Sequence, residues 1–95
     1  MVQLTSAMIR ELKSSAHSLS PITNVGKSGF TDTVFSEIDK HLAKRELIKV
    51  KVLKSVLESM SKKEVEKTLV DKLDCNVLAY TGNILILYRA HGTKD

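Results

Sequence analysis

The sequence contains little cysteine, few aromatic residues and no long apolar run. Its single cysteine, Cys75, excludes an internal disulfide, and at the start of an apolar strand we expect it to be a small buried hydrophobic residue. No stretch approaches the roughly 20 apolar residues of a membrane-spanning helix. Charged residues interrupt the N-terminal segment, unlike the apolar core of a signal peptide. We therefore expect a cytoplasmic protein with no membrane association.

Aromatic residues make up 4% of the 95 residues, which is too few for a surface on which unpaired bases stack. The three histidines, His17, His41 and His91, have no cysteine or carboxylate at metal-ligand spacing except Glu37, one helical turn before His41. That pair is typical of a contact on a helix surface. No catalytic triad or paired carboxylates occur. We predict no enzymatic activity, no cofactor, no metal and no small-molecule substrate.

Length and charge indicate one basic domain. Residues 1–95 suffice for a single modest core, and we expect 91–95 to be a flexible tail. The formal net charge is +4, and the positive charge is concentrated. Residues 40–54 hold six basic residues and one acidic residue, whereas residues 30–39 hold three acidic residues and no basic one. This concentration favours a polyanion partner, although a solvated basic face is the alternative.

Apolar periodicity predicts helices at 5–16, from Thr31 through Leu42, and from 61 to 73. Thr31 is the expected N-cap of the second helix, and Ser61 with Glu64 forms a capping box that opens the third. Residues 55–60 are an unassigned connection.

Strands are predicted at 22–25, 46–54, 75–80 and 84–89, the last two as a hairpin around 81–83. In the second, Ile48, Val50 and Val52 should face the core and the lysines solvent. The apolar run 84–87 predicts a central strand. The order α-β-α-β-α-β-β gives a single α/β domain, a mixed four-stranded sheet with packed helices.

The segment Gly26-Lys27-Ser28-Gly29 permits two interpretations. It contains the end of a nucleotide-binding P-loop, but the first glycine of that motif would fall at Pro21, which excludes it. As a GxxG loop before a helix, it could hold nucleic-acid phosphates on backbone N–H groups. It could also be only a tight turn that needs a positive φ at Gly26 or Gly29.

Several motifs in order resemble the CRM domain, the YhbY-like RNA-binding family of chloroplast splicing and ribosome maturation factors. They are the Ala-His-x-Leu-x-Pro segment 16–21, the GxxG loop, the segment 46–51 and a closing strand with Gly82, Leu87, Tyr88 and Arg89. One departure is Asp74, where the family tends to have a glycine. The resemblance implies a fold like the C-terminal domain of translation initiation factor three. It also implies binding to structured RNA, commonly ribosomal RNA of the large subunit.

The predicted function is therefore non-catalytic binding of structured RNA, with ribosomal RNA or a pre-ribosomal particle as partner during large-subunit assembly. If the first two strands are parallel, the loop and the end of the second strand lie together. The expected phosphate contacts are Gly26, Lys27, Ser28, Gly29, Lys51 and Lys54. A second tier comprises Lys49, Lys44 and Arg45, and Arg89 is added from the resemblance alone. The alternatives are a DNA- or chromatin-binding module and a protein-interaction domain. No oligomeric state is predicted.

Overall fold

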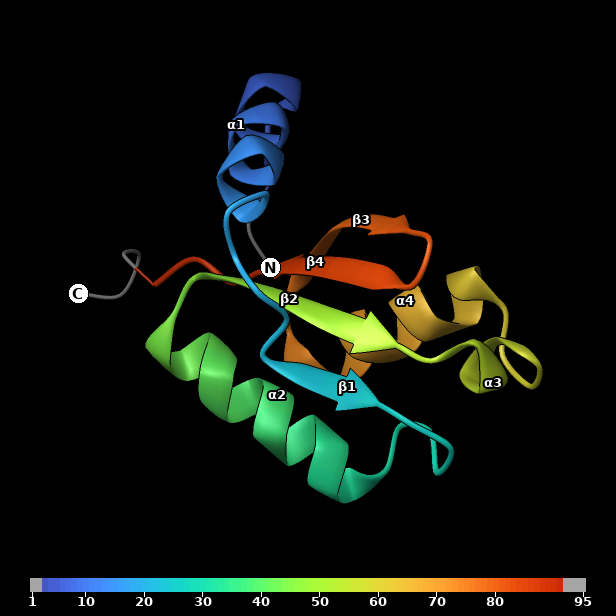
Figure 1. The fold of residues 1–95 in the computed structure, drawn as a ribbon. Coiled ribbons are helices and arrows are strands. Elements are labelled where there is room, and N and C mark those ends of the chain that lie inside the picture. The colour runs from blue at the N-terminus through green and yellow to red at the C-terminus, as the bar shows by residue number, and fades with distance from the viewer. Residues whose placement is uncertain (1–2, 92–95) are drawn as a thin grey trace.

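Four strands form one mixed sheet in the order β1-β2-β4-β3, in a computed structural model that describes residues 3–91 (Figure 1). The strands are β1 (Thr23–Val25), β2 (Leu47–Val52), β3 (Asn76–Thr81) and β4 (Ile84–Tyr88). β1 and β2 are parallel, whereas β4 is antiparallel to both β2 and β3. The predicted mixed four-stranded sheet and the central position of β4 are thus confirmed.

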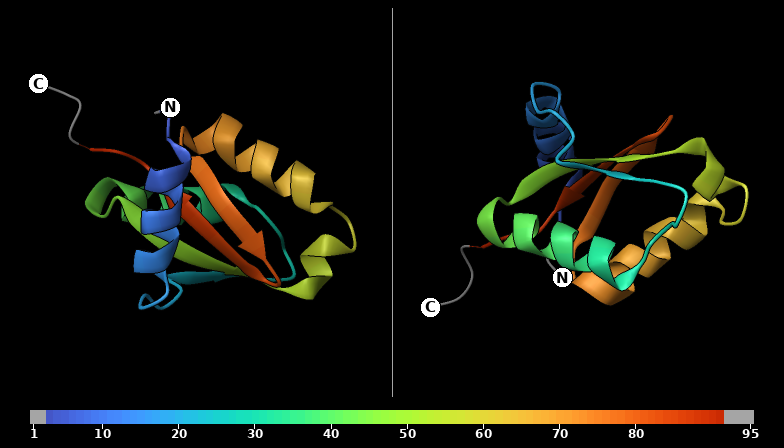
Figure 2. Two further views of the ribbon diagram at one scale, coloured as in Figure 1. Left: turned by 90° about the horizontal axis from the view of Figure 1, so that it is seen from above. Right: turned by 60° about the horizontal axis from the view of Figure 1, so that its bottom comes forward.

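Helices lie on both faces of this sheet. They are α1 (Ser6–Ala16), α2 (Asp32–Lys44), α3 (Lys54–Leu57) and α4 (Lys62–Leu73). α2 and α4 cover the face that carries the main core, while α1 crosses the opposite face and contacts β2 and β3 (Figure 2). α3 occupies part of the connection for which the sequence predicted no element. It was not predicted because four residues are too few for a recognisable apolar period.

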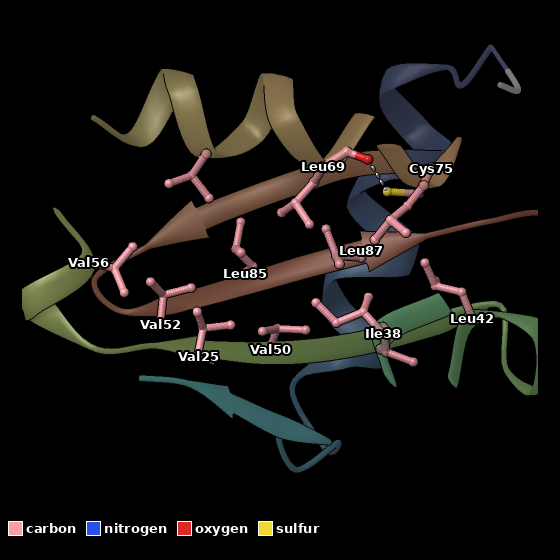
Figure 3. Close-up of a cluster of buried hydrophobic side chains, with 13 residues drawn as sticks. Val25, Ile38, Leu42, Val50, Val52, Val56, Leu69, Cys75, Leu85 and Leu87 are labelled. Atoms are coloured by element: carbon pink, nitrogen blue, oxygen red, sulfur yellow. Dashed lines mark hydrogen bonds between the residues drawn. The ribbon is translucent and has the colours of Figure 1, made fainter. Parts of the chain in front are cut away.

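The core is built on one side of the strands, as alternation in β2 predicts. Ile48, Val50 and Val52 are buried there, together with Leu85 and Leu87 of β4. Figure 3 shows Val50, Val52, Leu85 and Leu87 facing side chains of α2 and α4, with α1 behind the sheet. Because the lysines of β2 point the other way, the sheet has one core face and one basic face.

Local hydrogen bonds fix where α2 and α4 begin. The hydroxyl of Thr31 accepts the N–H of Val34 at 3.2 Å, which confirms the predicted N-cap of α2. Both bonds of the Ser61–Glu64 capping box are present, at 3.2 and 2.8 Å. Each cap of this kind contributes about 1 kcal/mol to helix stability. The cap of α2 is the more consequential for the site, because it sets where the GxxG loop ends.

α4 ends at Leu73, and the C-cap residue Asp74 adopts the left-handed conformation with φ of +51°. Its N–H donates to the carbonyl of Val70 at 3.2 Å, so the last turn of the helix is closed. Aspartate is one of the few residues with a side chain that visits this region at moderate cost. The turn where the family tends to have glycine therefore forms with Asp74 in its place.

At the end of the sheet away from the GxxG loop, Arg89 joins three elements. Its Nη2 donates to Asp39 Oδ1 of α2 at 2.7 Å and to the carbonyl of Leu73 in α4. Its backbone N–H donates to the carbonyl of Glu46, just before β2, at 2.8 Å. The backbone N–H of His91 donates to Glu46 Oε2 at 3.1 Å. Residues 92–95 of the predicted tail lie outside the described residues.

Candidate nucleic-acid interface

The GxxG loop, Gly26–Gly29, connects the end of β1 to the start of α2. The N–H of Gly29 donates to the carbonyl of Gly26 at 2.9 Å and closes a turn, in which Gly29 has φ of +74°. Gly26 has no positive φ, and a Cβ there would meet Leu53 Cδ1 at 3.7 Å, an ordinary contact. The conformational reason for a glycine therefore applies at Gly29 and not at Gly26.

Donors gather at the tip of this loop. Lys27 and Ser28 are exposed, and within residues 3–91 their backbone N–H groups donate to no acceptor. The N–H groups of Asp32 and Thr33, in the first turn of α2, also donate to no acceptor among residues 3–91, as is usual at a helix N-terminus. Backbone donors, a helix N-terminus and an ammonium group together suit a phosphate. The carboxylate of Asp32 is the one opposing charge in that turn.

Parallel pairing brings the end of β2 to the loop. Asn24 is the partner of Lys51 in the register, and the N–H of Leu53 donates to the carbonyl of Val25 at 2.9 Å. Lys51 is exposed on the basic face, and Lys54 is the first residue of α3. Lys27, Lys51 and Lys54, which we call the loop lysines, therefore lie at the same end of the sheet. Lys49 lies two residues back from Lys51 on the same face.

The remaining basic candidates lie at the opposite end. α2 ends at Lys44, and Arg45 precedes β2, whose six residues span about 20 Å between these side chains and the loop. Arg89 follows Tyr88, whose partner in β2 is Leu47, the first residue of that strand. Its guanidinium is engaged with Asp39 and the Leu73 carbonyl. The basic run that is continuous in sequence is thus divided between two ends of the sheet.

Sequence reasoning missed a set of polar residues that α1 brings to the basic face. Lys13 and His17, near the C-terminal end of α1, lie with Lys49 beside a shallow pocket over the sheet. The amphipathic pattern of α1 was visible, but it does not tell which face of the sheet the helix covers. No local signal could therefore have joined Lys13 and His17 to the lysines of β2.

Other kinds of chemistry find little support in the described part of the chain. Residues 3–91 hold no cluster of histidine, cysteine and carboxylate groups that could bind a metal ion. Among the same residues, no helix is long and apolar enough to span a bilayer. Cys75 is buried, as predicted, with Sγ 3.8 Å from the carbonyl of Leu69. Burial raises the pKa of the Cys75 thiol to about 11, so it stays protonated at neutral pH.

The protein is a small α/β domain. Its mixed four-stranded sheet has helices on both faces, and a GxxG loop joins β1 to α2. More specifically, residues 4–89 match the CRS1/YhbY (CRM) domain model, and the chain belongs to that family. The family expected from the motifs is therefore confirmed.

Relatives support the same assignment. The chain is 40% identical over 86 residues to YqeI of Bacillus subtilis, named a probable RNA-binding protein, covering 90% of this chain and 88% of YqeI. It is 35% identical over 89 residues to an RNA-binding protein of Haemophilus influenzae, covering 94% and 88%. A probable RNA-binding protein of Methanocaldococcus jannaschii is 39% identical over 87 residues, which are 92% of this chain but only 64% of that longer protein.

The fold also matches a solved structure. A candidate RNA-binding protein of Staphylococcus aureus, known from its solution structure, superposes with a TM-score of 0.79 at 33% identity. The match covers 98% of this chain and 95% of the other. The α/β fold is therefore shared over essentially the whole chain.

Proposed function

We propose that this protein binds structured RNA without catalysing a reaction, and that the GxxG loop and the loop lysines contact RNA phosphates. One observation carries the proposal: the β1–β2 register sets Lys51 beside the strand that leads into the loop. Three positive charges then lie at the same end of the molecule as the open backbone donors. The relatives named as RNA-binding proteins favour RNA as the polyanion.

The recognition we propose is of backbone and shape, because the aromatic rings are engaged in packing. Phe30 and Phe35 stack on each other with centroids 5.7 Å apart, and both pack against the core. Tyr80 also packs there, and Tyr88 is buried. Without exposed rings, affinity should come from phosphate contacts, fall steeply with salt and vary little with sequence.

A titration tests the proposal. A structured fragment of ribosomal RNA and a DNA duplex of matched length are titrated at two salt concentrations. The proteins are the wild type, the double variant Lys27→Ala/Ser28→Ala and the single variant Lys51→Ala. Lys40→Ala is the matched control, since it removes the same charge from an exposed position of α2 that is not among the expected phosphate contacts.

We expect RNA to be preferred at physiological salt and the double variant to lose about 1–3 kcal/mol of binding free energy. Lys51→Ala should lower the slope of log affinity against log salt by about one, because one phosphate contact is lost. Lys40→Ala should leave both quantities close to wild type. Equal weak binding of RNA and DNA, unchanged by every variant, would show that the loop is only a turn. A DNA-binding module would instead prefer the duplex, and a protein-interaction domain would bind neither.

We further propose that the RNA is ribosomal and that binding occurs in the cytoplasm during assembly of the large subunit, as the family resemblance implies. Sedimentation of cell extracts in a sucrose gradient tests this part separately. The protein should migrate with precursors of the large subunit and be released by high salt. Its absence from those fractions, with RNA binding intact in vitro, would redirect the search to another structured RNA.

A further inference from the structure

A groove lies on the basic face of the sheet, between α1 and the strands. Its volume is about 320 Å³, near the lower end of the roughly 300–1,000 Å³ typical of small-ligand pockets. The cationic and polar side, formed by Lys13, His17 and Lys49, comes from the end of α1 and from β2. None of the residues that line it is acidic.

The floor of the groove is apolar and follows from the strand register. Lys49 is opposite Ile86, which is opposite Ala79, so one row across β2, β4 and β3 runs from a cation to two apolar side chains. The next row contains Ile84, paired with Lys51 on one side and with Thr81 on the other. Ile84 and Ile86 are only half-buried, because α1 covers this face incompletely.

The groove is continuous with the proposed phosphate-binding loop. The row that contains Ile84 and Lys51 extends to Asn24 on β1, two residues before Gly26. Ile84 and Asn24 are therefore separated by two strand spacings, about 10 Å. An RNA strand held at the loop would need only a few nucleotides to reach the groove across the basic face.

We propose that the groove receives one unpaired nucleotide of the RNA that the loop holds. The base lies on the floor formed by Ala79, Ile84 and Ile86, and Lys13 and Lys49 neutralise its phosphate. An apolar floor with a cationic border matches the two parts of a nucleotide, whereas a base inside a duplex is stacked and cannot enter. Because no aromatic ring or acidic group lines the groove, the site should distinguish unpaired from paired nucleotides more than one base from another.

This inference rests on the proposed function, and the experiment separates the two. Fluorescence anisotropy compares two RNA hairpins of equal charge and length, each closed by the same non-nucleotide linker, one with a fully paired stem and one with a single unpaired nucleotide in its stem. The variant Ala79→Phe fills the groove but leaves its cations, and Thr81→Glu adds a negative charge at an exposed position on its border. Lys27→Ala/Ser28→Ala reports on the loop. Circular dichroism establishes that each variant is folded, and Thr81→Glu carries the test if Ala79→Phe is not.

We expect the wild type to prefer the hairpin with the unpaired nucleotide by at least about fivefold, the ratio that corresponds to covering roughly 40 Å² of apolar surface at about 25 cal/mol per Å². The groove variants should abolish that preference and leave the affinity for the paired hairpin within about twofold of wild type, since the loop still holds it. The loop variant should weaken both hairpins equally. If the loop variant weakens binding while the groove variants keep the preference, the nucleotide site is refuted and the proposed function stands. If no variant matters and DNA binds as well as RNA, both are refuted.

Discussion

The two glycines of the GxxG loop should differ sharply when each is replaced by alanine. Gly29 has φ of +74°, where a side chain costs about 1–2 kcal/mol. Alanine also restricts the unfolded chain, which returns roughly 0.4–1 kcal/mol of stability. With the midpoints of these two ranges, Gly29→Ala should destabilise the protein by about 0.8 kcal/mol. For a domain of this size, that lowers the melting temperature by roughly 3–6 °C.

Gly26→Ala is the matched control in the same loop. Its φ is not positive, and the added methyl would make only an ordinary contact with Leu53. The unfolded-state term then acts alone, and we expect Gly26→Ala to be neutral or more stable by up to about 1 kcal/mol. Thermal and urea unfolding followed by circular dichroism measure both variants. Equal losses at the two positions, or no loss at Gly29, would refute the assignment of the strained conformation to Gly29.

Three further predictions follow from single side chains. Asp32→Asn should tighten RNA binding in the same titrations and cost about 0.3–1 kcal/mol of stability, because the carboxylate stabilises the N-terminus of α2 but repels phosphate. An RNA affinity and a stability that both rise, or that both fall, would contradict this. Ser61→Ala should cost about 1 kcal/mol in urea unfolding through loss of the capping box, with no effect on RNA binding. Cys75 should resist thiol reagents in the native protein at pH 8. Because the pKa of Cys75 is about 11 in the folded protein and 9.0 in the unfolded chain, the unfolded thiol ionises first as the pH rises. The free energy of unfolding should therefore fall between about pH 9 and 11, and it should fall less in Cys75→Ala.

The sequence predicted those parts of the fold that depend on neighbours along the chain. The alternation of Ile48, Val50 and Val52 identified β2 and its core face, and hydrogen-bonding side chains identified the starts of α2 and α4. The short helix α3 escaped, since four residues carry no periodic signal. A left-handed residue at Asp74 could also not be inferred, because aspartate adopts many conformations and only the closing of the helix selects this one.

The candidate site was harder to predict because it depends on distances across the sheet. Lys44 and Lys51 belong to one basic run in sequence, but a strand length separates them in space. Conversely, Lys13 and Lys49 are far apart in sequence and line one groove, since α1 packs on the basic face. The contact between Arg89 and Asp39 joins residues of β4's end and α2, and nothing local to either residue indicates it. Charge composition therefore suggests a polyanion, whereas the placement of the charges requires the fold.

The brevity of β1 has a consequence for how the molecule opens. This strand is three residues long, lies at an edge of the described sheet and pairs with β2 alone. Its partner is distant in sequence, whereas β3 and β4 join through a two-residue turn, so β1 should dock late in folding and exchange its amide hydrogens early. The strand that carries the GxxG loop can then detach without unfolding the rest. Slower exchange at Asn24 and Val25 on adding RNA would make this strand the most sensitive reporter of an occupied loop.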